Sequence, residues 1–210
     1  MPIKSDREYR NIAEVLAPAD NMVVRGYATT YNQPYLLYRD KEVELWEQVD
    51  KNAFADTNMS DVIMQYDHEG RVFARTKNNT LVLRSDEHGL NIEANLGGTA
   101  IGRELFEEIK GGYTTKMSFG FTVKADEWTR STEDGIEKNL RTITSIGRLY
   151  DVSAVSLPAN DATEISVRGL SDGLIERLTA ERQEQKRLAE LAEKRNALLQ
   201  RIEESINGNQ

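Results

Sequence analysis

The stretch "TTKMSFGFTV", residues 114–123, carries the clearest strand pattern in the sequence. In it, a methionine and two phenylalanines alternate with Ser118 and Gly120. This period of two predicts a β-strand with one bulky face and one face that carries two small residues. The small face leaves room for a substrate backbone to approach. On these residues alone, Ser118 is either a strand serine that hydrogen-bonds a neighbour or a nucleophile.

Similar patterns lie on both sides of this stretch. Between residues 22 and 169, short runs rich in Val, Ile, Thr and aromatic residues are separated by Gly, Asn and Asp turn signals. The runs are "MVVRGYATTY", "EVELWEQV", "DVIMQY", "TLVLRSD", "LNIEANL", "KMSFGFTV", "LRTITSIGRLYDVSAV" and "TEISV". Their spacing predicts a β-barrel or sandwich, in contrast to a parallel α/β sheet. Residues 1–21 are either an extension or the first strand of this domain.

Two segments within the β-rich region predict helices. "VDKNAFADT", residues 49–57, is typical of a short helix. "TAIGRELFEEIKGG", residues 99–112, is a stronger case, because Thr99 can cap its start and Gly111 and Gly112 can stop it. The domain is therefore predicted to be α+β, with mostly strands and one or two helices packed on them.

Residues 170–210 differ from the β-rich domain in composition. From Ser171 onward there is neither an aromatic residue nor a proline, and Leu and Ile recur at helical spacing among charges of alternating sign. This pattern predicts a long amphipathic helix with coiled-coil character, although Gln185 and Arg195 interrupt the apolar seam. Such a helix is either simply solvated or binds a partner, which includes a second copy of the chain.

The overall composition argues against several classes of function. The chain has 210 residues and a formal net charge of −8, which disfavours a protein whose main task is to bind nucleic acid. It has no cysteine, which excludes disulfides, thiolate metal sites and cysteine nucleophiles, and its 2 histidines are few for a metal site. No apolar run approaches the roughly 18 to 20 residues of a membrane span. We therefore expect a soluble protein of a reducing cytosol.

His68 and Asp151 are the residues that could act together with Ser118. His68 follows the apolar run "DVIMQY", which places it at a strand end, although a lone histidine there is more often a surface residue, as we expect for His88. Asp151 interrupts an apolar strand, so it either needs a partner or faces solvent on an edge strand. A serine, a histidine and an acid can serve as nucleophile, general base and orienting group.

Six blocks of the sequence, in order, resemble the prohead maturation proteases of tailed bacteriophages, the HK97-type serine peptidases. The blocks are "GYATTYN" from Gly26, "KNAF" from Lys51, "YDHE" around His68, "TLVLRSDEHGL" from Thr80, "KMSFGF" around Ser118 and "LYDVSAVSLPAN" from Leu149. The resemblance runs from about residue 22 to residue 168, nearly the whole β-rich region. Six ordered blocks are more specific than any one of them.

This resemblance implies a fold and a set of site residues. The implied fold is similar to that of the herpesvirus assembly proteases, a mainly antiparallel β-barrel with helices around it. Ser118 matches the nucleophile, His68 the general base and Asp151 the third member, and by analogy the backbone amides near Arg148 would form the oxyanion hole. The implied activity is that of a serine endopeptidase that uses no cofactor and no metal.

The resemblance also implies a substrate and a location. Family members cleave the scaffolding region of the major capsid protein inside the immature capsid, the prohead, and then often themselves. We therefore expect the chain to act inside the prohead in the host cytoplasm, to be lost from the mature virion, and to contact neither nucleic acid nor membrane. The resemblance ends before residues 171–210, and a separate hypothesis is that this helix binds the scaffolding region or another copy of the chain, as a dimer or larger assembly.

Two other functions compete with this hypothesis. A non-enzymatic capsid scaffold or assembly module would use the β domain for docking and the helix for oligomerisation. It would have no reason to keep His68 and Ser118 together in these sequence contexts. A metal-dependent hydrolase is a more distant alternative, because two histidines so differently placed make a poor set of ligands.

Overall fold

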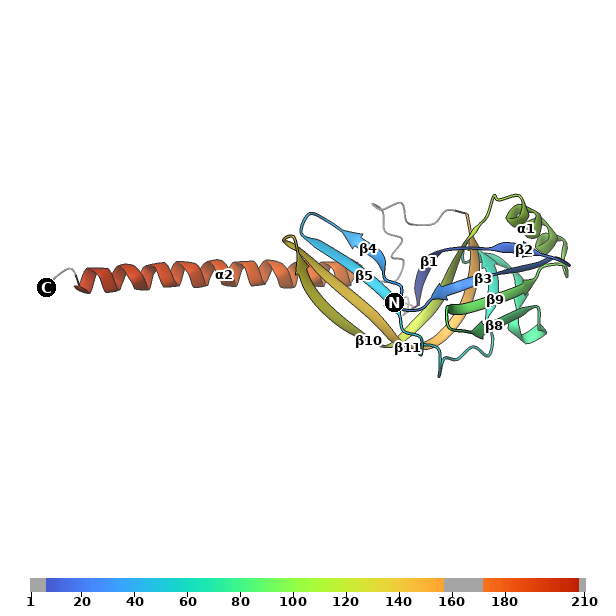
Figure 1. Ribbon diagram of the computed structural model, residues 1–210, viewed down its shortest axis with the longest axis horizontal. Helices are drawn as coiled ribbons and strands as arrows, with labels where there is room; N and C mark the ends of the chain where they lie inside the picture. The colour runs from blue at the N-terminus through green and yellow to red at the C-terminus, as the bar shows by residue number, and fades with distance from the viewer. Residues whose placement is uncertain (1–6, 157–171, 208–210) are drawn as a thin grey trace, which may run out of the picture. The chain divides into compact units, whose positions relative to one another are not determined.

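Two long strands form the centre of the β-rich region. In the computed structural model, which describes residues 7–156 and 172–207, these strands are β10 (Lys116–Glu133) and β11 (Ile136–Val155). They are the arms of one hairpin, closed by Asp134 and Gly135, which both have positive φ, as a two-residue hairpin turn of type I′ requires. Figure 1 shows the outer part of this hairpin beside the β4–β5 hairpin.

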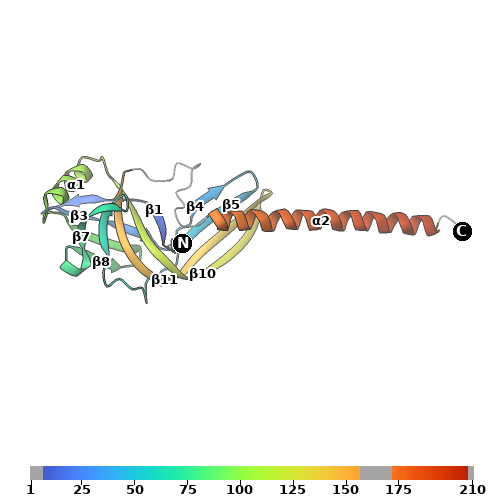
Figure 2. The same ribbon diagram turned by 180° about the vertical axis from the view of Figure 1, so that it is seen from behind.

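The strands form two sheets (Figures 1 and 2). The larger sheet has seven strands in the order β1-β10-β11-β5-β4, with β6 paired to β11 and β7 to β6, and the smaller has the order β2-β3-β9-β8. Their bounds are β1 (Glu8–Val15), β2 (Ala17–Ala19), β3 (Val23–Thr30), β4 (Tyr35–Arg39), β5 (Val43–Val49), β6 (Ile63–Tyr66), β7 (Glu69–Arg75), β8 (Leu81–Ser85) and β9 (Gly89–Asn95). A short 3₁₀ helix, η1 (Thr76–Asn78), connects β7 to β8.

The predicted α+β class is confirmed, but the predicted closed barrel is not observed. Among the described residues neither sheet closes on itself, because β1 pairs only with β10 and β4 pairs only with β5. The pairing is mainly antiparallel, as predicted. The long strand β11 is the exception, since it runs parallel to β5 along its first half and parallel to β6 near its end.

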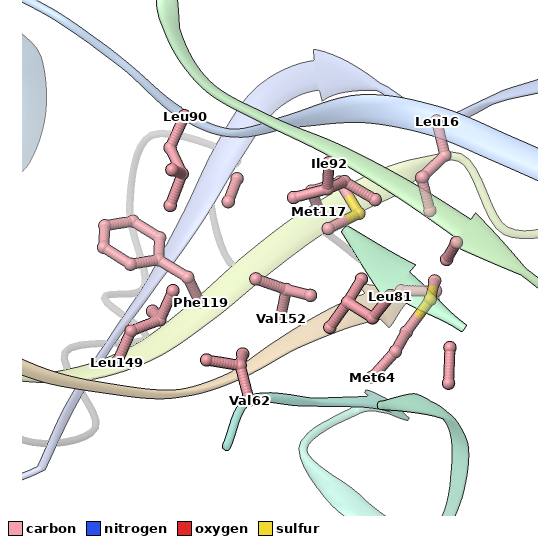
Figure 3. Close-up of a cluster of buried hydrophobic side chains, with 14 of the residues drawn as sticks. Leu16, Val62, Met64, Leu81, Leu90, Ile92, Met117, Phe119, Leu149 and Val152 are labelled. Atoms are coloured by element: carbon pink, nitrogen blue, oxygen red, sulfur yellow. The ribbon is translucent and has the colours of Figure 1, made fainter. Parts of the chain in front are cut away.

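One hydrophobic core joins the two sheets and the helix α1 (Ala100–Lys110). Figure 3 shows side chains from β6, β8, β9, β10 and β11 meeting in this core. Met117, Phe119 and Phe121, the bulky residues of β10, are fully buried there. The predicted helix is also confirmed, because α1 begins after Thr99, whose hydroxyl accepts a hydrogen bond from the Gly102 amide at 3.0 Å.

The second predicted helix, at residues 49–57, is wrong. This segment forms successive tight turns, in which the amides of Ala53 and Ala55 donate to the carbonyls of Asp50 and Asn52, at 3.0 Å in each case. The Asp50 carboxylate also accepts a hydrogen bond from the Asn52 amide at 2.8 Å. Aspartate and asparagine side chains compete in this way with regular helical hydrogen bonding. The run "TEISV" lies outside the described residues.

The chain divides into two units, residues 1–169 and 170–210. The second unit contains one helix, α2 (Asp172–Asn207), which confirms the long helix predicted from the sequence. Leu188, Leu191 and Leu198 are each at least half exposed on it, and its coiled-coil character stays a prediction. No helix in the described part of the chain is both long and apolar enough to cross a membrane.

Candidate active site

Ser118, His68 and Asp151 lie in one hydrogen-bonded chain. The Nε2 atom of His68 is 2.5 Å from Oγ of Ser118, and its Nδ1 atom is 2.5 Å from Oδ1 of Asp151. Ser118 lies on β10, Asp151 on the neighbouring β11, and His68 in the turn between β6 and β7. The structure thus brings together the three residues that the sequence proposed as nucleophile, base and orienting group.

The turn that carries His68 has an unusual backbone. Asp67 and His68 are its two central residues and have φ values of 47° and 62°, in the left-handed region that residues other than glycine seldom adopt. Two-residue hairpins require this conformation, and strained residues of this kind cluster at functional sites. The Asp67 carboxylate accepts hydrogen bonds from the amide and the hydroxyl of Ser156 at 3.0 and 2.9 Å, which fastens the turn to the chain directly after β11.

Asp151 is almost completely buried, with 1% of its surface exposed. Its Oδ1 atom accepts a hydrogen bond from Ser153 Oγ at 2.9 Å in addition to the contact with His68. Gly120 lies opposite Asp151 in the β10–β11 ladder, and the absence of a side chain there leaves room for the carboxylate. The next residue of β10, Phe121, pairs with Leu149. Tyr150 is therefore left without a partner on β10 and forms a β-bulge.

A family model for the Caudovirus prohead serine protease matches residues 10–174, a range that includes all three of these residues. The chain belongs to this family. The resemblance inferred from the six sequence blocks is therefore confirmed. No curated protein and no solved structure gives a significant match to the chain. At the level of the family, the chain is a serine protease of the phage prohead.

The predicted open face around Ser118 is not observed in this prohead protease. Ser118 has no exposed surface, and Gly120 is buried as well. The edge strand β1 pairs with this part of β10, so that Tyr9 lies opposite Gly120 and Asn11 opposite Ser118. The edge of β10 beside Ser118 is therefore occupied by the N-terminal strand of the same chain, and the Tyr9 ring packs against Gly120.

The other face of β1 is anchored by a charge cluster. Its members are Glu8, Arg10, Tyr35, Glu47 and Arg141. Arg10 binds both oxygens of Glu47, through Nε at 2.5 Å and Nη2 at 3.0 Å, and Arg141 binds Glu47 at 3.0 Å. Burial alone would raise the pKa of Glu47, but Arg10 and then Arg141 outweigh it and hold this pKa below its ordinary value. This cluster ties β1 to β5 and β11.

Arg148 pairs with none of the three site residues, and His88 lies in the turn between β8 and β9. Arg148 pairs with Thr122, four residues beyond Ser118 on β10, and its guanidinium lies 4.8 Å from the centre of the Tyr150 ring. The register therefore does not bring Arg148 next to Ser118, and its assignment to the oxyanion hole stays a prediction. His88 is exposed, as expected, and packs against Tyr27.

The sequence reasoning missed the residues that surround Asp151 and His68. These are Ser153, Arg7 and Tyr9, which contact one or other of them. Ser153 lies two positions from Asp151, so the period of two would have placed both on one face of the strand. Arg7 and Tyr9 precede the first of the six blocks, and only the alternation in "REYRNIAEV" points to a strand there.

Proposed function

We propose that this family member is a serine endopeptidase in which Ser118 is the nucleophile, His68 the general base and Asp151 the orienting acid. The observation that carries the proposal is the continuous chain from Ser118 Oγ through both nitrogens of His68 to Asp151 Oδ1. The same order of contacts recurs in serine peptidases on unrelated folds. A relation to the herpesvirus assembly proteases is part of the same proposal.

The reaction would follow the two steps of serine peptidases. As Ser118 Oγ attacks the scissile carbonyl carbon, His68 Nε2 takes the hydroxyl proton and then gives it to the leaving amine. Asp151 holds the imidazole by Nδ1 and stabilises the imidazolium cation while it exists. Water then attacks the acyl ester, with His68 again as the base, and releases Ser118. Backbone amides near Arg148 are the proposed oxyanion donors.

We propose that the substrate is the scaffolding region of the major capsid protein, and that the chain also cleaves itself. The family match to a prohead serine protease supports this substrate. The test is to incubate the purified chain with the uncleaved capsid precursor and to identify new peptide termini by mass spectrometry. New termini in both proteins would support the proposal. An intact precursor would contradict it and favour a non-enzymatic assembly module.

Recruitment to the prohead is a separate proposal and concerns α2. Its exposed leucines would bind the scaffolding region or a second copy of the chain, and the helix would be removed on maturation, when the protease is lost from the virion. A chain that ends at Gly169 should retain cleavage activity in solution but should not be incorporated into proheads. Equal incorporation of the shortened and full chains, measured by mass spectrometry of purified proheads, would refute recruitment by α2.

A further inference from the structure

We propose that Tyr9 and Arg7, at the start of the N-terminal strand, are positioning residues for the catalytic triad. The inference rests on the proposed function of Ser118, His68 and Asp151. Both residues lie before residue 10, where the match to the family begins. Side chains alternate along a strand, and Tyr9 pairs with Gly120, which places Tyr9 on the same face as the triad.

Tyr9 restrains the ring of His68. The two rings meet edge to face, with 4.4 Å between their centres and 62° between their planes. This is a favourable geometry for two aromatic rings. The contact depends on Gly120, because a Cβ atom there would lie 2.8 Å from Cε1 of Tyr9. His68 comes from a strained turn, and the Tyr9 ring contacts its imidazole in addition to the hydrogen bonds with Ser118 and Asp151.

Arg7 connects Tyr9 to Asp151. Its Nη1 atom lies 3.7 Å from Oδ2 of Asp151 and donates a hydrogen bond to the Tyr9 hydroxyl at 3.3 Å. Oδ2 is buried and accepts no hydrogen bond from any residue that the structure describes, whereas Oδ1 contacts both His68 and Ser153. The positive charge of Arg7 therefore faces the carboxylate oxygen that the triad leaves without a hydrogen bond.

The position of the Arg7 guanidinium is itself defined. Its central carbon lies 3.8 Å from the centre of the Tyr150 ring, and Tyr150 is the bulge residue next to Asp151. A guanidinium over an aromatic face gains a cation–π interaction. Tyr150, Arg7 and Tyr9 thus form one stack of side chains that ends at His68. This stack holds the imidazole within reach of Ser118 while protons are transferred.

The test uses a fluorophosphonate probe, which needs no knowledge of the natural substrate. Ser118 Oγ forms a bond to phosphorus as the P–F bond breaks, fluoride leaves, and His68 takes the hydroxyl proton. We expect Tyr9→Ala to lower the maximal labelling rate about tenfold or more, since a misplacement of about 1 Å can cost about 10²-fold. The probe concentration at half-maximal rate should change little. Tyr9→Phe, which keeps the ring, should restore most of the rate.

The chain offers a matched control in a second pair of tyrosine and histidine. Tyr27 and His88 also meet edge to face, with 4.5 Å between ring centres. Tyr27→Ala removes a comparable contact outside the triad and should leave the labelling rate unchanged. Arg7→Ala should slow labelling and Arg7→Lys should restore it in part. The double variant of Arg7 and Tyr9 should lose less than the product of the two single losses, because the residues contact each other.

The outcomes separate this inference from the proposed function. If the unmodified chain is not labelled, or if Ser118→Ala is labelled equally well, the proposed function fails. If the unmodified chain is labelled and Tyr9→Ala reacts as fast or faster, Tyr9 is only a cover and the inference fails. It also fails if Tyr27→Ala slows labelling to the same extent. Should Tyr9→Ala not fold, as judged by circular dichroism, Tyr9→Leu and Arg7→Ala are assessed by the same rates.

Discussion

Gly120 lies opposite Asp151 across the β10–β11 ladder, and a Cβ atom on Gly120 would come within 2.3 Å of the Asp151 carboxylate oxygen Oδ2. Two such atoms cannot approach so closely, so the Asp151 carboxylate or the β10 backbone would have to move. The carboxylate is buried and bonded to His68 and Ser153, so it has little freedom to give way. The glycine of the Phe-Gly-Phe triplet is therefore part of the site, although it contributes no chemical group.

Gly120→Ala should lower the cleavage rate by about 10²-fold, because the added methyl group displaces Asp151 and Tyr9 from their positions. The measurement is the rate of cleavage of the capsid precursor, with circular dichroism to confirm the fold. Gly98→Ala is the control, since a Cβ atom there would meet no described atom within 4 Å. Equal activity of the two variants would show that the close approach at Gly120 is unimportant.

Ser118→Ala and His68→Ala should each abolish cleavage while leaving the fold intact, because each removes an atom that takes part in bond making or proton transfer. Asp151→Asn should retain a slow reaction, reduced by about 10⁴-fold, since it keeps the shape of the side chain but favours the wrong tautomer of His68. Single-turnover cleavage measures all three. Processing by Ser118→Ala at the normal rate would exclude Ser118 as the nucleophile.

Asp67→Ala should lower activity about tenfold, because it releases the His68 turn from Ser156 and allows the imidazole to move away from Ser118. The control is Asp86→Ala, which loosens the turn that carries His88. There the Asp86 carboxylate accepts hydrogen bonds from the amides of His88 and Gly89 at 2.8 and 2.9 Å. We expect Asp86→Ala to cleave at the normal rate, and a similar loss in both variants would point to a general effect on folding.

Glu47→Gln should destabilise the fold at neutral pH by about 3 kcal/mol, because it removes the fully buried anion of the cluster and leaves Glu8 as the carboxylate partner of Arg10. The pKa of Glu47 is lowered in the folded state, so its contribution is complete above the unfolded value of about 4.3 and is lost as the pH falls through the folded value. Urea unfolding should be measured at a series of pH values from 7 downward. The free energy of unfolding should fall less steeply with decreasing pH in the variant than in the unmodified chain.

The control for Glu47→Gln is Glu93→Gln. Glu93 pairs with Arg25 at 2.8 Å on the surface, where an ion pair contributes little. This variant should differ from the unmodified chain by less than about 0.5 kcal/mol at every pH. The buried charge cluster does not anchor β1 in the way described if both variants lose the same stability. The same conclusion follows if the free energy of unfolding of Glu47→Gln falls with decreasing pH as steeply as that of the unmodified chain.

Secondary-structure elements were predicted from the sequence where their signals lie within a short stretch of residues. The helix α1 was predicted because its cap, apolar stripe and terminal glycines all lie within fourteen residues, 99–112. The outer half of β10 and residues 136–139 at the start of β11 are not predicted as strands, because much of residues 124–138 is exposed and carries no apolar alternation. The parallel pairing of β11 with β5 and β6 depends on tertiary contacts, which no short stretch of sequence encodes.

The candidate site shows the same division. Ser118, His68 and Asp151 were proposed because each stands in a recognisable block, and the structure places them in contact. The contacts of Arg7 and Tyr9 arise only when β1 pairs with β10, more than 100 positions later in the chain. The burial of Ser118 was missed as well, since the small face of a strand looks open until the residues packed on it are known.

The positions of the three site residues along the chain also affect when the site can form. Ser118 and Asp151 lie on the two arms of one hairpin, whereas His68 belongs to another hairpin, 83 residues before Asp151. Chains emerge from the ribosome N-terminus first, and contacts between distant segments form late in folding. A nascent chain that has not yet exposed β11 cannot complete the hydrogen-bonded chain of Ser118, His68 and Asp151. If these residues act as proposed, synthesis itself delays proteolysis until the β-rich region has been completed.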